Sequence, residues 1–169
     1  REAEVLGDLA VVDPAELSNT TPGTEVMIHG TLSGNAERER GLVYFVHQRW
    51  VVEWDSNDDR YRGDWEFVRA TFPAVTVAVE GRAVQVNAAD SLLSWGGFDT
   101  AIIIEEGTGR RVDGYTDGTI RITGLLNGDE VTFTGIKQPN GTLTPNRVFG
   151  GSPGEMRQQA QLGAIIAAC

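Results

Sequence analysis

Alternation of apolar and polar residues is the feature that most restricts how this chain can fold. Successive side chains of a β-strand point to opposite faces, so apolar residues at every second position indicate a half-buried strand. The longest case spans residues 42–54, where one face carries Leu42, Tyr44, Val46, Gln48, Trp50, Val52 and Trp54. A polar turn at residues 55–59 and a return strand with Tyr61, Trp65 and Phe67 on one face complete a long aromatic hairpin.

The same pattern recurs along most of the chain. A second hairpin is predicted at residues 75–86, with Gly81 supplying the backbone freedom that its turn needs. Further strands are predicted at residues 24–33, 101–105, 119–123, 130–136 and 143–149. About eight to ten antiparallel strands with short links predict a mainly β barrel or sandwich, and a length of 169 residues fits a single compact unit.

Helix signals are few. Ser152 can cap a helix, Pro153 suits the first helical position, and Glu155 completes a capping box. The sequence therefore predicts a C-terminal helix from Pro153 to residue 169. Weaker signals predict a helix at residues 13–19 and a helical turn at residues 87–95.

The charge balance limits the classes of partner. Acidic residues outnumber basic ones by 24 to 14, which gives a net charge of −10. This charge opposes binding to nucleic-acid phosphates, and an OB-like barrel for single strands would need a basic groove beside its aromatic residues. Only one lysine, Lys137, is present. Such a composition is typical of halophilic-type surfaces, and a GC-rich genome that favours arginine codons is the alternative explanation.

Metal and cofactor sites are not indicated. The lone Cys169 excludes a thiolate metal cage, and His29 and His47 stand in no close-spaced pattern of metal ligands. We expect both histidines to be surface or half-buried residues with ordinary hydrogen bonds. We therefore predict no metal, no cofactor and no catalytic residue.

Carboxylates leave one enzymatic alternative open. Glu105 and Glu106 are neighbours on a predicted strand and point to opposite faces, so they cannot form the facing pair that a glycosidase needs. Either of them paired with Asp99, Asp113 or Asp117 would give a carboxylate-based hydrolase acting on sugars or cell-wall material.

Aromatic residues of the long hairpin are the candidate binding surface. Aromatic side chains offer large contact areas, so the functional interpretation is a groove or interface for a small ligand or a protein. The alternative is that these residues fill the core or pack across the hairpin. The candidate residues are Tyr44, Trp50, Trp54, Tyr61 and Trp65, with Phe67 beside them.

The apolar run at residues 162–169 is shorter than the roughly 20 residues of a membrane span. We read it as the opening of a longer hydrophobic segment; a short helix that docks on its own domain is the alternative. This gives three expected regions: a membrane-proximal segment at residues 1–16, a β domain at residues 17–151, and a helix at residues 152–169 that leads into a transmembrane segment.

Several of these segments, taken in order, resemble one known domain. The stretches that carry the resemblance are residues 22–30 (PGTEVMIHG), 42–44 (LVY), 72–75 (FPAV), 84–86 (VQV) and 128–135 (GDEVTFTG). Together they are similar to the "beside a membrane" or GIDE domain of MULAN-type E3 ubiquitin ligases and their bacterial and archaeal relatives. Val43 stands where that family commonly has a cysteine, and its Asp-x-x-Gly turn appears only as Glu80-Gly81.

The resemblance covers most of residues 17–149 and implies a location and a role. In that family the domain lies between two transmembrane helices, which implies a membrane-anchored, extracytoplasmic domain that senses a ligand or binds a protein. Ligase activity there belongs to a RING finger built from cysteine and histidine zinc ligands, and this sequence has no such cluster. The chain is therefore expected to be non-catalytic by itself.

Overall fold

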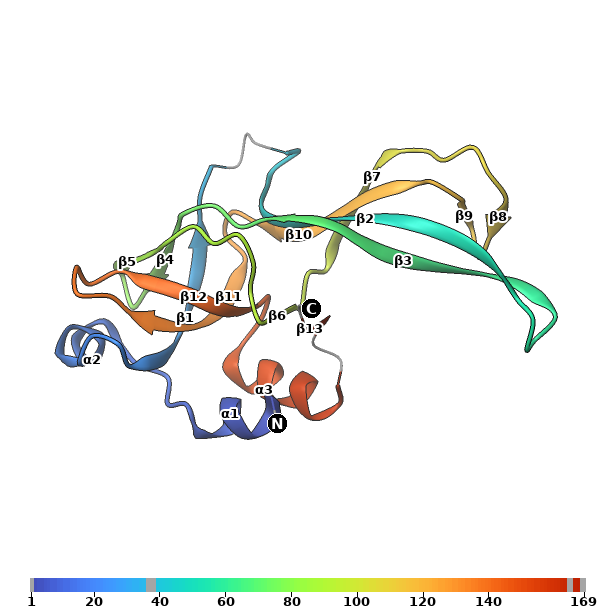
Figure 1. Ribbon diagram of the computed structural model, residues 1–169. Coiled ribbons are helices and arrows are strands. Elements are labelled where there is room, and N and C mark those ends of the chain that lie inside the picture. Colours follow the sequence, from blue (N-terminus) through green and yellow to red (C-terminus); the bar gives the residue numbers. More distant parts are fainter. Residues whose placement is uncertain (1, 36–38, 164–165, 168–169) are drawn as a thin grey trace.

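One sheet of the protein curls into a barrel, and a second, longer sheet extends from it to one side (Figure 1). The computed structural model describes residues 2–35, 39–163 and 166–167. The mainly β class predicted from the alternation is confirmed. The elements in chain order are α1 (Glu2–Asp8), α2 (Pro14–Asn19), β1 (Glu25–Ser33), β2 (Leu42–Asp55), β3 (Arg60–Thr71), β4 (Val75–Val79), β5 (Arg82–Val86), β6 (Ser94–Gly96), β7 (Thr100–Glu105), β8 (Arg111–Val112), β9 (Tyr115–Thr116), β10 (Ile120–Leu126), β11 (Glu130–Lys137), β12 (Leu143–Phe149), α3 (Pro153–Gln161) and β13 (Ile166–Ala167).

Five strands close the barrel. They follow one another around the ring as β1, β4, β5, β12 and β11, and β11 pairs with β1 again. The pairings are antiparallel except for the contact of β12 with β5, which is parallel and rests on Leu143 opposite Val86. Numbered along the chain, the ring strands stand in the order 1-2-3-5-4. This is the connectivity of the five-stranded Greek-key barrel called the OB fold.

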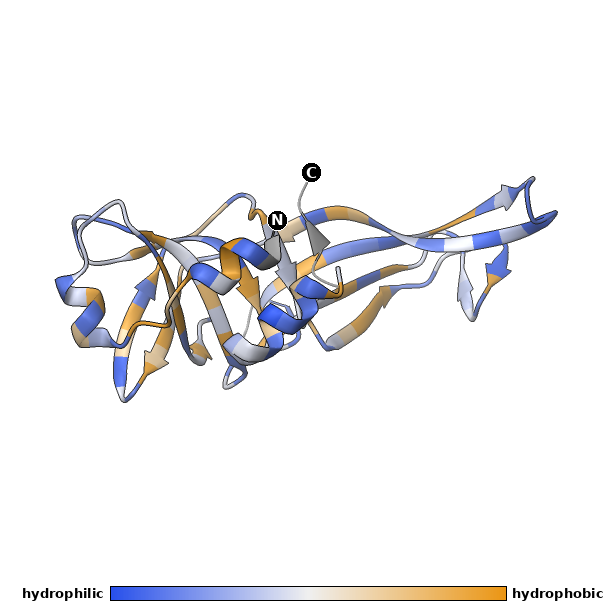
Figure 2. Ribbon diagram, turned by 90° about the horizontal axis from the view of Figure 1, so that it is seen from below, coloured by the Kyte–Doolittle hydropathy of each residue, from blue (hydrophilic) through white to orange (hydrophobic). Residues whose placement is uncertain are grey.

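The alternating apolar residues of the ring strands fill the barrel. In β4, Val75, Val77 and Val79 are buried, while Thr76 and Ala78 between them are more exposed, as a period of two requires. Full burial of one such side chain contributes about 1.5–3 kcal/mol to folding. Figure 2 shows apolar segments gathered in the barrel strands, whereas the outer part of the long hairpin alternates hydrophilic and intermediate residues.

A second sheet leaves the barrel. Its strands lie in the order β3, β2, β10 and β7. The first half of β2 is buried against the barrel, and its second half runs outward with β3. We call residues 49–67, the outer parts of β2 and β3 with their turn, the arm. The predicted aromatic hairpin is confirmed: Trp50 lies opposite Trp65, and Trp54 lies opposite Tyr61.

Helices α1 and α3 pack against each other below the barrel in the view of Figure 1, and α2 lies at the end of the barrel away from the arm. Leu6 of α1 and Met156 of α3 are fully buried in one small cluster with Met27 and Phe149. The side chain of Arg157 ties the two helices together, because it donates to the backbone oxygens of Leu6 (3.1 Å) and Leu9 (2.8 Å). The sequence analysis did not predict α1.

The C-terminal helix begins where predicted and ends earlier. Ser152 and Glu155 form the expected capping box, with both hydrogen bonds at 3.1 Å. The prediction that it runs to the chain end is wrong, because α3 stops at Gln161. Gly163 follows in the left-handed region at φ 69°, a conformation that terminates helices. Beyond it, Ile166 pairs with Trp95 as strand β13, while residues 164–165 and 168–169 of the predicted helix lie outside the described part.

The two weaker helix predictions differ in outcome. The helix at residues 13–19 is confirmed as α2, capped by Asp13. The helical turn at residues 87–95 is not formed, because the backbone N–H groups of Asn87, Ala89 and Leu93 donate to neighbouring strands and bridges instead of to the preceding turn. Within the described residues, no helix combines the length and apolar character needed to cross a membrane.

Candidate functional site

The inner part of the arm is an aromatic cluster built from three strands. The ring centroids of Trp50 and Trp65 lie 5.0 Å apart, and Tyr115 of β9 packs at 5.2 Å from the first and 4.9 Å from the second. The guanidinium of Arg121 stands 4.0 Å above the Trp65 ring and donates to Gln48 at 2.9 Å. Burial lowers the pKa of Arg121, with Tyr115 acting in the opposite direction. The cluster fixes the arm against β10 and the β8–β9 hairpin.

The outer part of the arm exposes its aromatic residues. Trp54 and Tyr61 pack edge to face at 5.0 Å, and the guanidinium of Arg110 lies 3.9 Å over the Tyr61 ring. Trp54 is nevertheless 53% exposed, and Phe67 is 59% exposed. Val68 next to it is also exposed. Trp54, Phe67 and Val68 are therefore apolar side chains open to solvent, whereas Arg110 covers part of Tyr61.

The sequence-predicted set is divided by the structure. Trp50, Trp54, Tyr61 and Trp65 lie together on the arm, whereas Tyr44 lies inside the barrel. The Tyr44 ring packs between Phe72 and Phe133, its hydroxyl has no hydrogen-bond partner among the described residues, and burial raises its pKa. Tyr44 is therefore a core residue, whereas the other four candidates lie on the arm.

The β8–β9 hairpin supplies partners that the sequence analysis missed. Arg110 precedes β8 and Tyr115 begins β9. One sequence signal was available, the dipeptide Asp113-Gly114, which favours a two-residue hairpin turn. In the structure both residues have the positive φ that such a turn requires, 51° and 91°. The contact of this hairpin with the arm joins residues far apart in the sequence. The dipeptide would therefore have predicted the turn, but not that the hairpin packs against the arm.

The tip of the arm is charged. Arg62 pairs with Asp55 at 2.5 Å and also with Asp58, while Arg60 lies 3.8 Å from Asp58. Exposed pairs of this kind contribute only about 0–1 kcal/mol each. They hold the turn in shape and keep the end of the arm hydrated.

The two histidines lie in different environments. Nε2 of His29 is 2.6 Å from a carboxylate oxygen of Glu130 on the barrel surface. His47 is buried, which corrects the expectation of a surface or half-buried residue; its ring packs 5.7 Å from Phe45, and its Nδ1 has no partner among the described residues. Burial lowers the pKa of His47, as does Arg69 to a smaller degree, and Glu39 acts in the opposite direction. The described residues hold no cluster of three metal-ligating side chains.

The acids considered for a hydrolase have structural or solvent-exposed positions. Asp113 lies at the β8–β9 turn, and Asp117 accepts a hydrogen bond of 2.9 Å from a backbone N–H of β2. Glu105 and Glu106 are exposed at the end of β7. Of the five acids considered, Asp99 lines a pocket together with other acidic residues.

That pocket has a volume of about 300 Å³ and lies where β11 meets the start of α3. Its acidic side chains are Asp99, Asp129, Glu130 and Glu155. Three of the four carboxylates already have partners: Asp129 accepts from a backbone N–H at 2.8 Å, Glu130 faces His29, and Glu155 completes the cap of α3. The arrangement supports the local structure and presents no free facing pair of carboxylates.

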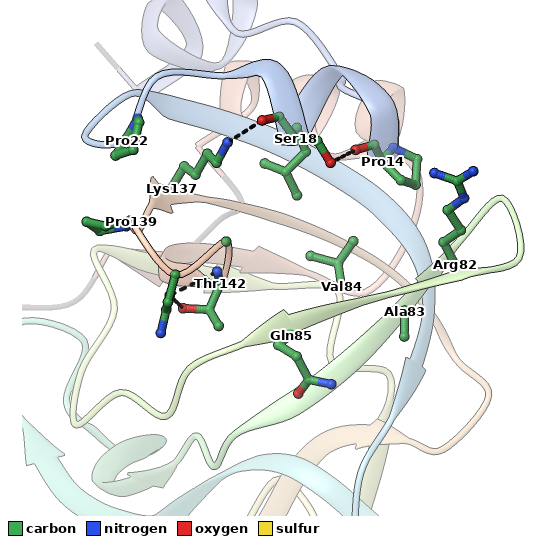
Figure 3. A pocket seen from close by; sticks show the side chains of 13 residues that line it. Pro14, Ser18, Pro22, Arg82, Ala83, Val84, Gln85, Lys137, Pro139 and Thr142 are labelled. Carbon is green, nitrogen blue, oxygen red and sulfur yellow. Dashed lines mark hydrogen bonds between the residues drawn. The ribbon is translucent and has the colours of Figure 1, made fainter.

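A second pocket, of about 520 Å³, lies between α2, β5 and the β11–β12 loop (Figure 3). The ammonium group of Lys137 closes one side, where it donates to the backbone oxygens of Ser18 (3.0 Å) and Thr20 (2.6 Å). Proline rings and amide side chains form much of the remaining wall. The lining holds no carboxylate, histidine or cysteine, and its one lysine, Lys137, is held by the two backbone oxygens.

The arm and this second pocket are thus two features of the described residues that are open to another molecule. The arm is the more distinctive, because exposed aromatic side chains on a long hairpin have no role in filling the barrel. Comparisons with protein-family models, with curated proteins and with solved structures find no match for this chain.

Proposed function

We propose that this chain is a non-catalytic protein-interaction module and that the arm is its contact surface. The observation that carries the proposal is the exposure of Trp54 and Phe67, each more than half accessible, on a hairpin that leaves the barrel. Trp54 pairs directly with Tyr61, and Tyr61, Trp65 and Phe67 stand at alternate positions of β3, so these rings share one face of the arm. Aromatic residues presented together are the usual anchors of protein interfaces.

The inner aromatic cluster supports this role because it fixes the arm before any partner arrives. Trp50 is only 6% exposed and contacts both Trp65 and Tyr115. A surface that is already ordered loses less conformational entropy on binding. The exposed rings at the outer end are therefore carried by a preorganised support.

The charges of the arm favour a protein over a nucleic acid. A phosphate backbone requires basic side chains beside the aromatic rings. Along residues 49–67 the bases are Arg49, Arg60 and Arg62, and they are outnumbered by the acids Glu53, Asp55, Asp58, Asp59, Asp64 and Glu66.

The location we propose is beside a membrane, on its extracytoplasmic side, in a membrane-anchored parent protein. The support is the GIDE-like order of motifs, two of which, residues 22–30 and 128–135, form the paired strands β1 and β11. Separation of the parent organism's membranes from its aqueous fraction, followed by detection of this domain with an antibody, tests the location. Recovery in the aqueous fraction alone would exclude the anchor.

Site-specific photo-crosslinking tests the interaction itself. A benzoylphenylalanine placed at Phe67 in the parent protein, in its native membranes, should give one discrete protein adduct, and Trp54→Ser should abolish that adduct. The matched control is the same group at Leu93, which is 56% exposed and lies on the barrel. No adduct from Phe67, or the same adduct from both positions, would rule out the arm as the contact surface.

A further inference from the structure

Strand β3 has an open hydrogen-bonding edge. It is the last strand of its sheet, and within the described part of the chain it pairs only with β2. The N–H and C=O of Trp50 bond to Thr119 and Gly118 at 2.8 Å, so they point away from β3. Two residues that face each other in an antiparallel ladder either bond to each other or both turn their backbone groups away from each other. Trp65 lies opposite Trp50, so its N–H and C=O point away from β2, toward the open edge.

The same reasoning applies at alternate positions along the arm. The N–H of Val52 donates to Asp117 at 2.9 Å, again away from β3, and Gly63 lies opposite Val52. The N–H of Trp65 donates to the carboxylate of its own neighbour, Asp64, at 2.9 Å. Tyr61, Gly63 and Trp65 therefore turn their backbone groups to the edge of the sheet, where no other described strand pairs with them and the Asp64 carboxylate holds the Trp65 N–H. An edge of this kind is a template for another strand.

We propose that this edge pairs with β3 of a second copy of the chain, antiparallel, about a two-fold axis at Gly63. The inference rests on the proposed function and names the partner that the arm contacts. It joins the two four-stranded sheets into one continuous sheet and places the aromatic faces of both arms side by side.

The register follows from backbone geometry and charge. The residues of β3 whose backbone groups face the open edge are the odd-numbered ones, such as Tyr61, Gly63 and Trp65. Ladder bonds between two copies therefore form only in registers that set an odd-numbered residue of one copy opposite an odd-numbered residue of the other. A centre at Gly63 sets Arg62 against Asp64 and Arg60 against Glu66, each twice by symmetry.

The neighbouring registers of the same parity bring like charges together. A centre at residue 62 sets Arg62 against itself, and a centre at residue 64 sets Asp64 against itself. A centre at residue 61 pairs Arg60 with Arg62, and one at residue 65 pairs Asp64 with Glu66. Like charges directly opposite each other destabilise a strand pair, so the centre at Gly63 is selected.

The side chains of this register suit its positions. The two charged pairs fall at non-hydrogen-bonded sites, where facing side chains are closest, and Tyr61 meets Trp65 on the aromatic face. Among the described residues Glu66 forms no ion pair, and Asp64 accepts only from the Trp65 N–H. In the dimer Arg60 and Arg62 exchange their partners within one copy, Asp55 and Asp58, for the carboxylates of the second copy, and the Trp65 N–H exchanges Asp64 for a ladder bond. A register shift of β3 against β2 beyond Phe67 ends the regular edge just past the paired residues.

Charge reversal tests the pairing in sedimentation velocity experiments on the 169-residue chain. The wild type is expected to form dimers. E66R sets two arginines against each other and should weaken dimerisation about tenfold or more. Adding R60E restores the opposite-charge pair and should restore the dimer. E106R changes an exposed acid outside the arm and serves as the control for net charge.

Cysteine pairing tests the register. In a Cys169→Ser background, Arg62→Cys and Asp64→Cys chains that are mixed and oxidised should form the mixed disulfide, because these positions face each other across the two strands. Either variant alone should remain largely unlinked. Equal linking by Arg62→Cys alone would overturn the centre at Gly63.

The two proposals fail in different ways. A wild type that stays monomeric at high concentration, or equal behaviour of E66R and E106R, would overturn the second copy as partner. If the Phe67 crosslinker then captures a different protein, the proposed function stands without self-pairing. Loss of the adduct altogether removes the proposed function as well.

Discussion

The indole ring of Trp50 lies directly against Gly63 across the arm. A Cβ atom built on Gly63 would stand 2.0 Å from Cζ2 and 2.3 Å from Cε2 of that indole. Real Cβ atoms do not approach other atoms so closely, so the aromatic cluster requires a residue without a side chain at this place in β3. The glycine thus has a packing reason within the strand, where it otherwise weakens a ladder.

Gly63→Ala is therefore expected to destabilise the arm. Displacement of a packed ring of this kind costs about 1–3 kcal/mol. The measurement is the tryptophan near-ultraviolet circular dichroism together with urea unfolding. Gly7→Ala is the control, because its Cβ would meet no atom within 4 Å in helix α1, where alanine gains about 0.5–1 kcal/mol over glycine. Equal effects of the two substitutions would contradict the packing argument.

His47 is expected to make the protein less stable as the pH falls. Its pKa in the folded state lies below the ordinary value of 6.5, so the unfolded chain binds the proton more readily. The stability is complete above the unfolded pKa and declines as the pH drops below about 6.5. Urea unfolding of the wild type and of His47→Gln between about pH 7.5 and about pH 5.5 measures this effect. Parallel pH profiles for the two proteins would disprove it.

Tyr44→Phe is expected to leave the protein as stable as the wild type or more stable. The buried hydroxyl has no partner among the described residues, and burial of an unbonded hydroxyl costs about 1–3 kcal/mol. Because burial raises the pKa of Tyr44, the wild type also loses stability as the pH rises above the ordinary value of 10.0. Thermal unfolding at neutral and alkaline pH checks both effects. A clear loss of stability at neutral pH would show that the hydroxyl is bonded.

Lys137→Met is expected to release helix α2 from the barrel. The substitution keeps an unbranched side chain but removes the two charge-assisted hydrogen bonds to Ser18 and Thr20, at a cost of about 1.5–3 kcal/mol. Hydrogen exchange of the α2 amides and urea unfolding measure the change. Arg82→Met in the same pocket is the control, since the exposed Arg82 forms no hydrogen bond or ion pair with the described residues. A similar response from both variants would mean that Lys137 does not anchor the helix.

The predicted hairpins show where sequence reasoning succeeds. Residues 75–86 pair around Gly81, and residues 42–54 pair with the strand that carries Tyr61 and Trp65. Both depend on alternation and on turn residues, which act between close neighbours in the chain. The start of α3 at Ser152 was predictable for the same reason, because a capping box is a local set of hydrogen bonds.

The candidate site was predictable only in part. The alternation placed Tyr44 and Trp50 on one face of one strand, and the structure buries the first in the barrel and the second in the arm. Strand β2 is long enough to leave the barrel partway, and no local signal marks where it does so. Likewise, Leu6 is the one fully buried side chain among residues 4–8 of α1, and the helix depends on packing against α3 more than on its own sequence.

The sequence by itself determined where the longer strands lie, where the turns of the two predicted hairpins fall and how two of the helices begin, because these follow from a period of two and from backbone preferences of single residues. The short strands β6, β8, β9 and β13 were not predicted. Only the tertiary structure decided that β1, β4, β5, β12 and β11 close into a ring, and that the β8–β9 hairpin packs against the arm. The physical reason is that the hydrophobic effect is non-directional: it drives an apolar side chain into contact but does not specify which distant partner it meets. Which distant residues come into contact depends on how all the strands pack together.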